Sequence, residues 1–192
     1  MNSLNILIVG VGGQGTLLAS RLLGNVALKK SYDVKLSEVH GMSQRGGSVV
    51  THVKFGEKIY SPLVEKGEAD IIIAFEQLEA LRWLDYLKPN GKMIINDQMI
   101  SPMPVIIGKA KYPENIIGKI KELHESTVSI DALELARQSG NIKAVNVVLL
   151  GLLASKTDIS KDIWLESLKE VVPERFLDVN MKAFELGYSL QQ

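Results

Sequence analysis

The residues best suited to chemistry form a glycine-rich turn near the N-terminus. The segment reads GVGGQG and fits the pattern G-x-G-x-x-G, between an apolar run of strand length and a predicted helix. Gly10 permits a tight turn, Gly12 lets a ligand approach the backbone, and Gly15 lets the helix and strand pack closely. The candidate ligand-binding residues of this turn are Gly10, Gly12, Gly13, Gln14, Gly15 and Thr16.

Two interpretations of this turn stay open. The free N–H groups of the first helical turn would favour an anion such as a phosphate. Alternatively, the glycines only close the helix against the sheet. A dinucleotide site would also need an acidic residue about 20 residues further on, and Glu38 is a passable candidate. The turn therefore permits a nicotinamide dinucleotide without requiring one.

A second unusual segment is polar and rich in glycine, whereas its flanks resemble strands. Residues 37–53 read SEVHGMSQRGGSVVTHV. Its glycines can adopt positive φ and bring backbone amides close to another surface. Arg45 offers a planar fork for carboxylate or phosphate, and Met42 offers an adaptable apolar contact. The candidate ligand-binding or partner-facing residues are Glu38, His40, Gly41, Met42, Ser43, Gln44, Arg45, Gly46 and Gly47.

We expect residues 38–48, the polar loop, to fold over the glycine turn and face a partner subunit or an anionic ligand. The alternative is that Gln44 and Arg45 only tie this loop to its own sheet. Replacement of Arg45 by alanine distinguishes the two.

Further polar residues follow two predicted parallel strands. Glu76 comes after Phe75, and Asp97 comes after Asn96. Because ligands of open α/β sheets bind at the carboxyl ends of the strands, these groups should converge on the glycine turn. His40, Glu76 and Asp97 could act as acids, bases or hard-metal ligands. In the simpler interpretation, Glu76 and Asp97 accept backbone N–H bonds at the next turn. The sequence predicts neither a catalytic nucleophile nor a metal site.

The chain alternates between strand and helix patterns over its first 130 residues or so. Strands are expected at 4–10, 33–39, 49–55, 70–75, 92–97, 104–110 and 127–130, and helices at 14–30, 77–87 and 114–124. Residues 55–60, FGEKIY, are typical of a hairpin turn, which predicts an antiparallel pair inserted beside the main sheet. These patterns predict a single α/β domain with a Rossmann-like, open, mainly parallel sheet covered by helices on both faces.

The remaining part, from about 131 to 192, is predicted to be helical, with helices near 131–139, 143–155, 161–170 and 175–189. The segment 144–154 is apolar almost all round, so it must be enclosed by the core or by another subunit. Its main polar interruption, Asn146, should find a hydrogen-bond partner, because an unpaired buried amide costs about 1–3 kcal/mol.

Composition excludes several classes of protein. Twenty-two basic and 22 acidic residues cancel, so neither nucleic acid nor an anionic membrane is an expected partner. The sequence contains no cysteine, which excludes disulfides and a conventional iron–sulfur cluster held by this chain alone. Because the first apolar run is interrupted by glycines and lacks a basic leader, it predicts a strand rather than a signal peptide, and hence a cytoplasmic location.

Taken together, HGMSQRGGSV at 40–49 and GVGGQG at 10–15 resemble the gamma-type subunits of the 2-oxoacid:ferredoxin oxidoreductases. The His-Gly-Met-Ser-Gln-Arg-Gly-Gly form is similar to that in the beta subunit of indolepyruvate ferredoxin oxidoreductase. Pyruvate-type gamma subunits carry a Glu-Arg-Arg-Gly-like sequence there, which this chain lacks. The resemblance also includes 62–82, 146–151 and 180–187, so it covers nearly the whole chain.

This resemblance implies the oxidative decarboxylation of an aryl pyruvate with coenzyme A, giving an acyl-CoA, carbon dioxide and reduced ferredoxin. It also implies that thiamine diphosphate and 4Fe-4S clusters belong to a larger partner subunit, in agreement with the missing cysteines. This chain would complete the assembly and shape the approach of coenzyme A or substrate. Two other hypotheses remain: a stand-alone NAD(P)-dependent oxidoreductase using the glycine turn and Glu38, and a regulatory nucleotide-binding module.

Overall fold

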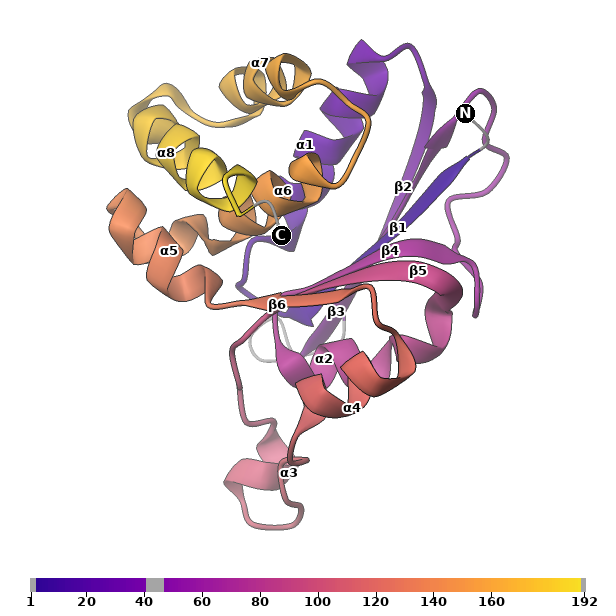
Figure 1. Cartoon of the computed structure of the whole chain (residues 1–192), viewed down its shortest axis with the longest axis vertical. Coiled ribbons are helices and arrows are strands. Elements are labelled where there is room, and N and C mark those ends of the chain that lie inside the picture. The colour runs from indigo at the N-terminus through magenta and orange to yellow at the C-terminus, as the bar shows by residue number, and fades with distance from the viewer. Residues whose placement is uncertain (1–2, 41–46, 191–192) are drawn as a thin grey trace.

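A computed structural model describes residues 3–40 and 47–190 and shows one six-stranded sheet (Figure 1). The strand order is β2-β3-β1-β4-β5-β6. The strands are β1 (Leu4–Val11), β2 (Asp33–His40), β3 (Ser48–Gly56), β4 (Ala69–Ala74), β5 (Leu87–Asn96) and β6 (Thr127–Ile130). The central strand β1 reads LNILIVGV and is buried along almost its whole length, as expected of a strand covered on both faces.

The sheet is parallel on one side of β1 and antiparallel on the other. β1, β4, β5 and β6 form parallel neighbours, with Ile8 opposite Ile73 in the register. β3 runs antiparallel to both β1 and β2, with Thr51 opposite Ile8 on one side and Glu38 on the other. The predicted α/β class and mainly parallel sheet are therefore confirmed, and β2 and β3 form the antiparallel pair.

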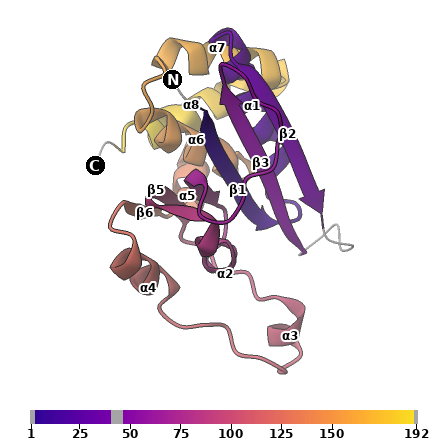
Figure 2. The same ribbon diagram turned by 90° about the vertical axis from the view of Figure 1, so that its right-hand side faces the viewer.

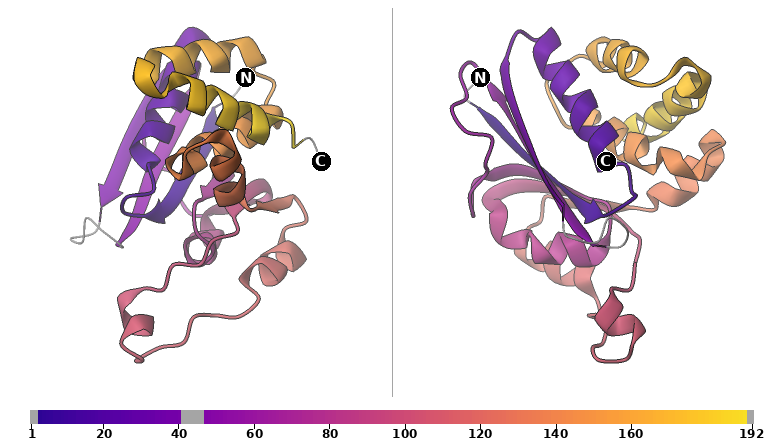
Figure 3. Two further views of the ribbon diagram at one scale, coloured as in Figure 1. Left: turned by 90° about the vertical axis from the view of Figure 1, so that its left-hand side faces the viewer. Right: turned by 180° about the vertical axis from the view of Figure 1, so that it is seen from behind.

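Helices cover both faces of the sheet (Figures 1 and 2). α1 (Thr16–Lys29), α5 (Ala132–Ser139), α6 (Val145–Ser155), α7 (Lys161–Val171) and α8 (Leu177–Tyr188) lie on one face, whereas α2 (Gln77–Arg82) and α4 (Ile116–Leu123) lie on the other. The short helix α3 (Met103–Ile106) stands apart from both layers (Figure 3). Each face encloses its own apolar cluster, and the larger one lies under the C-terminal helices.

The apolar helix α6 is buried by this chain itself. It packs against α5, α8 and α1, and its residues from Val147 to Leu153 are inaccessible to solvent. Two glycines allow the closest contact: a Cβ atom at Gly151 would overlap the carbonyl oxygen of Phe184, and one at Gly187 would overlap that of Val148. The core interpretation of this helix is therefore confirmed.

Three local predictions are wrong. Residues 55–60 are not a hairpin turn, because β3 ends at Gly56 and residues 57–68 form neither helix nor strand. The expected strand at 104–110 is instead α3 followed by a turn; Pro104 cannot donate to a sheet ladder, and the segment lies away from the sheet edge.

The third error concerns the start of β5. The helix expected over 77–87 ends at Arg82 and is followed by a 3-10 turn over Leu84–Tyr86. β5 then begins at Leu87 rather than at 92, because residues 88–91 form an irregularity between the pairs Ala69–Leu87 and Ile71–Lys92. Pro89 and Gly91 mark this bulge rather than the boundary of the strand.

Candidate functional site

The glycine turn, residues 10–15, connects β1 directly to α1. Gly13 and Gly15 have φ values of 99° and 84°, in the left-handed region that favours glycine. Gly15 occupies the N-cap position of α1, so the helix begins without a side-chain cap, and its first turn carries no acidic residue. This end of α1 retains the partial positive charge of a helix N-terminus.

Gln14 ties the glycine turn to the end of the neighbouring strand β4. Its side-chain oxygen accepts a hydrogen bond from the Val11 N–H at 2.8 Å. Its Nε2 donates to the Phe75 carbonyl oxygen at 3.0 Å. The Gly12 N–H donates to the carbonyl oxygen of Gly47 at 2.9 Å. The Gln14 N–H also donates to the Val11 carbonyl oxygen at 3.3 Å. The amides of Val11, Gly12 and Gln14 are therefore occupied within the chain, and those of the first turn of α1 are the candidates for an external anion.

A cavity of about 570 Å³ lies beside this end of α1. Gly15, Leu18 and Gln98 contribute to its wall, and Ile142, Lys143 and Asn146 contribute from the start of the C-terminal helical region. Asn146 Nδ2 donates to the Gly15 carbonyl oxygen at 3.1 Å, which confirms the expected hydrogen bond of this buried amide. The cavity combines an exposed lysine, apolar side chains and a helix N-terminus, a mixture suited to a ligand with an anionic group and an apolar chain.

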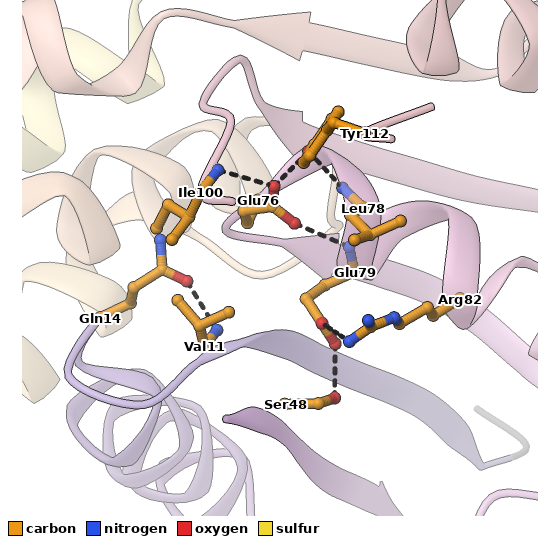
Figure 4. A network of polar contacts seen from close by, with 9 residues as sticks. All are labelled: Val11, Gln14, Ser48, Glu76, Leu78, Glu79, Arg82, Ile100 and Tyr112. Atoms are coloured by element: carbon orange, nitrogen blue, oxygen red, sulfur yellow. Dashed lines mark hydrogen bonds and ion pairs between the residues drawn. The ribbon is translucent and has the colours of Figure 1, made fainter. Parts of the chain in front are cut away.

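Glu76 lies buried at the end of β4 and makes three hydrogen bonds (Figure 4). One carboxylate oxygen accepts from the Glu79 N–H at 2.9 Å, capping α2. The other accepts from the Ile100 N–H at 3.0 Å and from the Tyr112 hydroxyl. Burial, followed by the bond to Glu76, raises the pKa of Tyr112, so this hydroxyl remains protonated and donates. The interpretation of Glu76 as an acceptor of backbone hydrogen bonds is therefore confirmed.

A second buried carboxylate, Glu79, joins α2 to the start of β3. It accepts from the Ser48 hydroxyl at 2.5 Å and forms an ion pair with Arg82 at 2.6 Å (Figure 4). Burial is the largest influence on its pKa and raises it above the ordinary glutamate value, although Ser48 and Arg82 act in the opposite direction.

The polar groups after β5 join the same region. Asn96 Nδ2 donates to the Phe75 carbonyl oxygen at 3.1 Å, so this oxygen also receives the bond from Gln14. Asn96 Oδ1 accepts from the Ala132 N–H, whereas Asp97 accepts from the side chain of Gln77 at 2.6 Å. The glycine turn and the ends of β4 and β5 therefore converge as predicted, although Asp97 accepts a side-chain bond instead of the expected backbone bond.

Glu38 lies elsewhere. β3 separates its strand from β1, and the Glu38 carboxylate accepts a hydrogen bond from Thr51 at 3.0 Å. In a dinucleotide-binding fold, the acidic residue ends the parallel strand next to the glycine-turn strand. Here that position belongs to the antiparallel β3, so the geometry does not favour Glu38 as a ribose ligand.

The structure places one end of the polar loop, at Gly47 and Ser48, against the glycine turn, whereas the other end lies on β2, one strand further out. His40 ends β2 and pairs with Val49, and Ser48 pairs with Val11. Gly41, Met42, Ser43, Gln44, Arg45 and Gly46 lie outside the described residues. Within the described ranges, no group of three or more His, Asp or Glu side chains could hold a metal ion.

Sequence reasoning missed Glu79, Tyr112 and Lys143, and it included Ser48 only as the last residue of the polar loop. The spacing of Glu76 and Glu79 around a helix start was an available signal, because an acidic N-cap followed three residues later by glutamate resembles a capping box. Only the tertiary structure brings Tyr112 to Glu76 and Lys143 to the cavity, so no local sequence signal pointed to either residue.

The sequence matches a known family over nearly its full length. The description Pyruvate ferredoxin/flavodoxin oxidoreductase fits residues 5–190. The chain belongs to this family. It is 45% identical to the indolepyruvate oxidoreductase subunit IorB of Pyrococcus horikoshii, over 97% of this chain and 95% of that protein.

Solved structures share the fold of this family member. A keto/oxoacid ferredoxin oxidoreductase gamma subunit from Geobacter sulfurreducens superposes with a TM-score of 0.72 at 23% identity, covering 97% of this chain and 96% of that one. A 2-oxoglutarate:ferredoxin oxidoreductase from Magnetococcus marinus superposes with a TM-score of 0.75 at 20% identity. It covers 99% of this chain but only 31% of that longer chain. Among the helices that the structure describes, none is long and apolar enough to cross a membrane.

Proposed function

We propose that this protein is the cofactor-free subunit of an indolepyruvate, or arylpyruvate, ferredoxin oxidoreductase. The complex converts an aryl 2-oxoacid and coenzyme A into an acyl-CoA and carbon dioxide, and passes two electrons to ferredoxin. The observation that carries this proposal is the 45% identity to an indolepyruvate oxidoreductase subunit over nearly the whole of both chains. We further propose a cytoplasmic location for this complex.

The proposal assigns thiamine diphosphate and the 4Fe-4S clusters to a larger partner subunit, where they supply the decarboxylation and electron-transfer chemistry. The sequence supports this division, because its 192 residues include no cysteine to ligate a cluster. The described side chains also hold no candidate metal group. The proposal assigns no catalytic residue to this chain, which is inactive alone.

In this proposal the edge formed by the glycine turn and residues 38–48 faces the partner subunit or an anionic ligand. Coenzyme A has phosphates and a long arm in which amide groups alternate with methyl and methylene groups, which match the mixed wall of the 570 Å³ cavity. Lys143 and the N-terminus of α1 would attract the phosphates, and Leu18 and Ile142 would contact the arm.

Affinity purification from the native cell tests the proposal. The chain should co-purify with a larger subunit that contains iron, and the complex should reduce ferredoxin when supplied with indolepyruvate and coenzyme A. The isolated chain should show neither turnover nor calorimetric binding of NAD(P). Recovery of a lone chain that binds nicotinamide nucleotide and transfers hydride unaided would overturn the proposal.

A further inference from the structure

A segment between β5 and α4 projects away from the body of the protein. Residues 99–112, which we call the arm, extend from the sheet edge, with α3 near the far end (Figures 1 and 2). Four large apolar side chains on it are exposed: Met99, Met103, Ile106 and Ile107. Met103 and Ile106 are 67% and 66% exposed, respectively. Such a group is unusual on a surface that faces only water.

The arm is anchored at both ends of its base. The Ile100 N–H and the Tyr112 hydroxyl both donate to the buried carboxylate of Glu76. The Tyr112 oxygen also accepts from the Leu78 N–H at 3.1 Å, which fixes it to α2. These bonds hold the two ends of the arm together and attach them to the start of α2.

The far end of the arm has a defined conformation of its own. The Ile107 N–H donates to the Met103 carbonyl oxygen at 3.0 Å, and the Lys109 N–H donates to that of Pro104 at 2.8 Å. Proline restricts the backbone at Pro102 and Pro104. The apolar side chains are therefore presented in a pre-organised form, which lowers the entropy cost of binding.

The charge of the arm indicates what kind of surface it fits. Its only charged residues are Lys109 and Lys111, both exposed, so the arm is apolar and basic. Two copies of the arm packed on each other would bring like charges together, which disfavours arm-to-arm packing between copies of this chain. An apolar groove with an acidic rim on a different chain would complement both features.

We propose that the arm docks into an apolar groove with an acidic rim on the larger subunit of the complex. The inference rests on the proposed function. The arm leaves the sheet at the edge that carries the glycine turn, because Gln98 approaches Gln14 at 3.5 Å. A partner that binds the arm therefore lies at the same edge of the sheet as the cavity beside the N-terminus of α1. In the Magnetococcus marinus protein, this fold makes up 31% of a longer chain.

The test compares purified chains for binding to the purified larger subunit by calorimetry or surface plasmon resonance. The double variant Met103→Asp/Ile106→Asp should bind at least about tenfold more weakly than the wild type, since buried apolar anchors dominate interface energy. Leu123→Asp is the matched control, because Leu123 is 70% exposed on α4 and lies outside the arm. It should retain wild-type affinity. Circular dichroism and thermal melting show whether each variant is folded.

A second variant leaves every apolar side chain of the arm in place. Tyr112→Phe removes the hydroxyl that bonds Glu76 and Leu78. Amide hydrogen exchange over residues 99–111 should become faster, and affinity for the larger subunit should fall by a smaller factor than in the double variant.

The outcomes separate the two proposals. If the wild-type chain does not bind the larger subunit, both proposals fail. If the wild type binds and the folded double variant binds equally well, the docking inference fails alone. Sedimentation of the isolated chain provides a further check: a wild-type dimer that the double variant converts to monomer, with the hetero-complex unaffected, would assign the arm to a second copy instead.

Discussion

The hydroxyl of Ser48 donates a hydrogen bond of 2.5 Å to the buried carboxylate of Glu79. Ser48 is the last residue of the polar loop and the first of β3, whereas Glu79 lies on α2. Glu79 also donates its backbone N–H to Glu76, which holds the base of the arm. Three segments distant in sequence are thus connected through two buried carboxylates.

Ser48→Ala should destabilise the protein by about 1–3 kcal/mol at neutral pH, because the hydrogen bond that it removes ends on a carboxylate. Burial already raises the pKa of Glu79 above the ordinary 4.5, and loss of the Ser48 bond raises it further. The folded state therefore binds more protons than the unfolded state above about pH 4.5, and stability falls as pH rises through this range.

The destabilisation by Ser48→Ala should accordingly grow with pH from about 4.5 and become small below it, where the carboxyl is protonated in both states. Urea unfolding at a series of pH values measures this difference. Ser61→Ala, which alters an exposed serine, is the control. A destabilisation independent of pH would show that the Ser48–Glu79 bond does not contribute as inferred.

His52 should make the stability of the protein sensitive to mild acid. This side chain is only 6% exposed, and its Nδ1 accepts a hydrogen bond from the Val64 N–H at 3.1 Å. Burial, and then Lys54, lower the pKa of His52 below the ordinary 6.5. The unfolded state therefore binds the proton first, and stability is lost as pH falls below about 6.5. Between pH 7.5 and 5, the melting temperature of His52→Gln should fall by less than that of the wild type.

Gly187→Ala should destabilise the core by about 1–3 kcal/mol or more, since the added methyl group would overlap the Val148 carbonyl oxygen and force α6 and α8 apart. Gly24→Ala is a matched control inside α1, where the new Cβ would lie 3.4 Å from Leu36 Cδ1. Because alanine has a higher helix propensity than glycine, Gly24→Ala should stabilise the protein by about 0.5–1 kcal/mol or leave its stability unchanged. Denaturant unfolding measures the stability of both variants. Equal losses of stability in Gly187→Ala and Gly24→Ala would contradict this account of the contact between α6 and α8.

Arg45→Ala should lower turnover or subunit association in the reconstituted complex if the polar loop faces a partner or an anionic ligand. Arg137→Ala removes an exposed arginine on α5 and serves as the control. Steady-state ferredoxin reduction and the dissociation constant of the subunits are the two measurements. If neither changes, the loop only connects β2 to β3.

Local sequence patterns were sufficient for the main layers of this fold. Continuous apolar runs such as 70–75 predicted buried parallel strands, and the glycines of GVGGQG predicted a turn between a strand and a helix. Those signals are local: side-chain alternation, helical periodicity and the special backbone freedom of glycine act over a few residues. Asn146 could also be predicted to need a partner, although its partner, Gly15, could not be named.

The assembly of the candidate site was decided by tertiary structure. The insertion of β3 between β1 and β2 moved Glu38 away from the glycine turn, and strand order is set by long-range pairing that periodicity does not encode. Gln14, Phe75 and Asn96 likewise meet through the parallel packing of three strands separated by many residues. The sequence alone determined which residues were polar, flexible or apolar. Only folding determined which of them share an edge, because the energies of those contacts depend on distances between segments far apart in the chain.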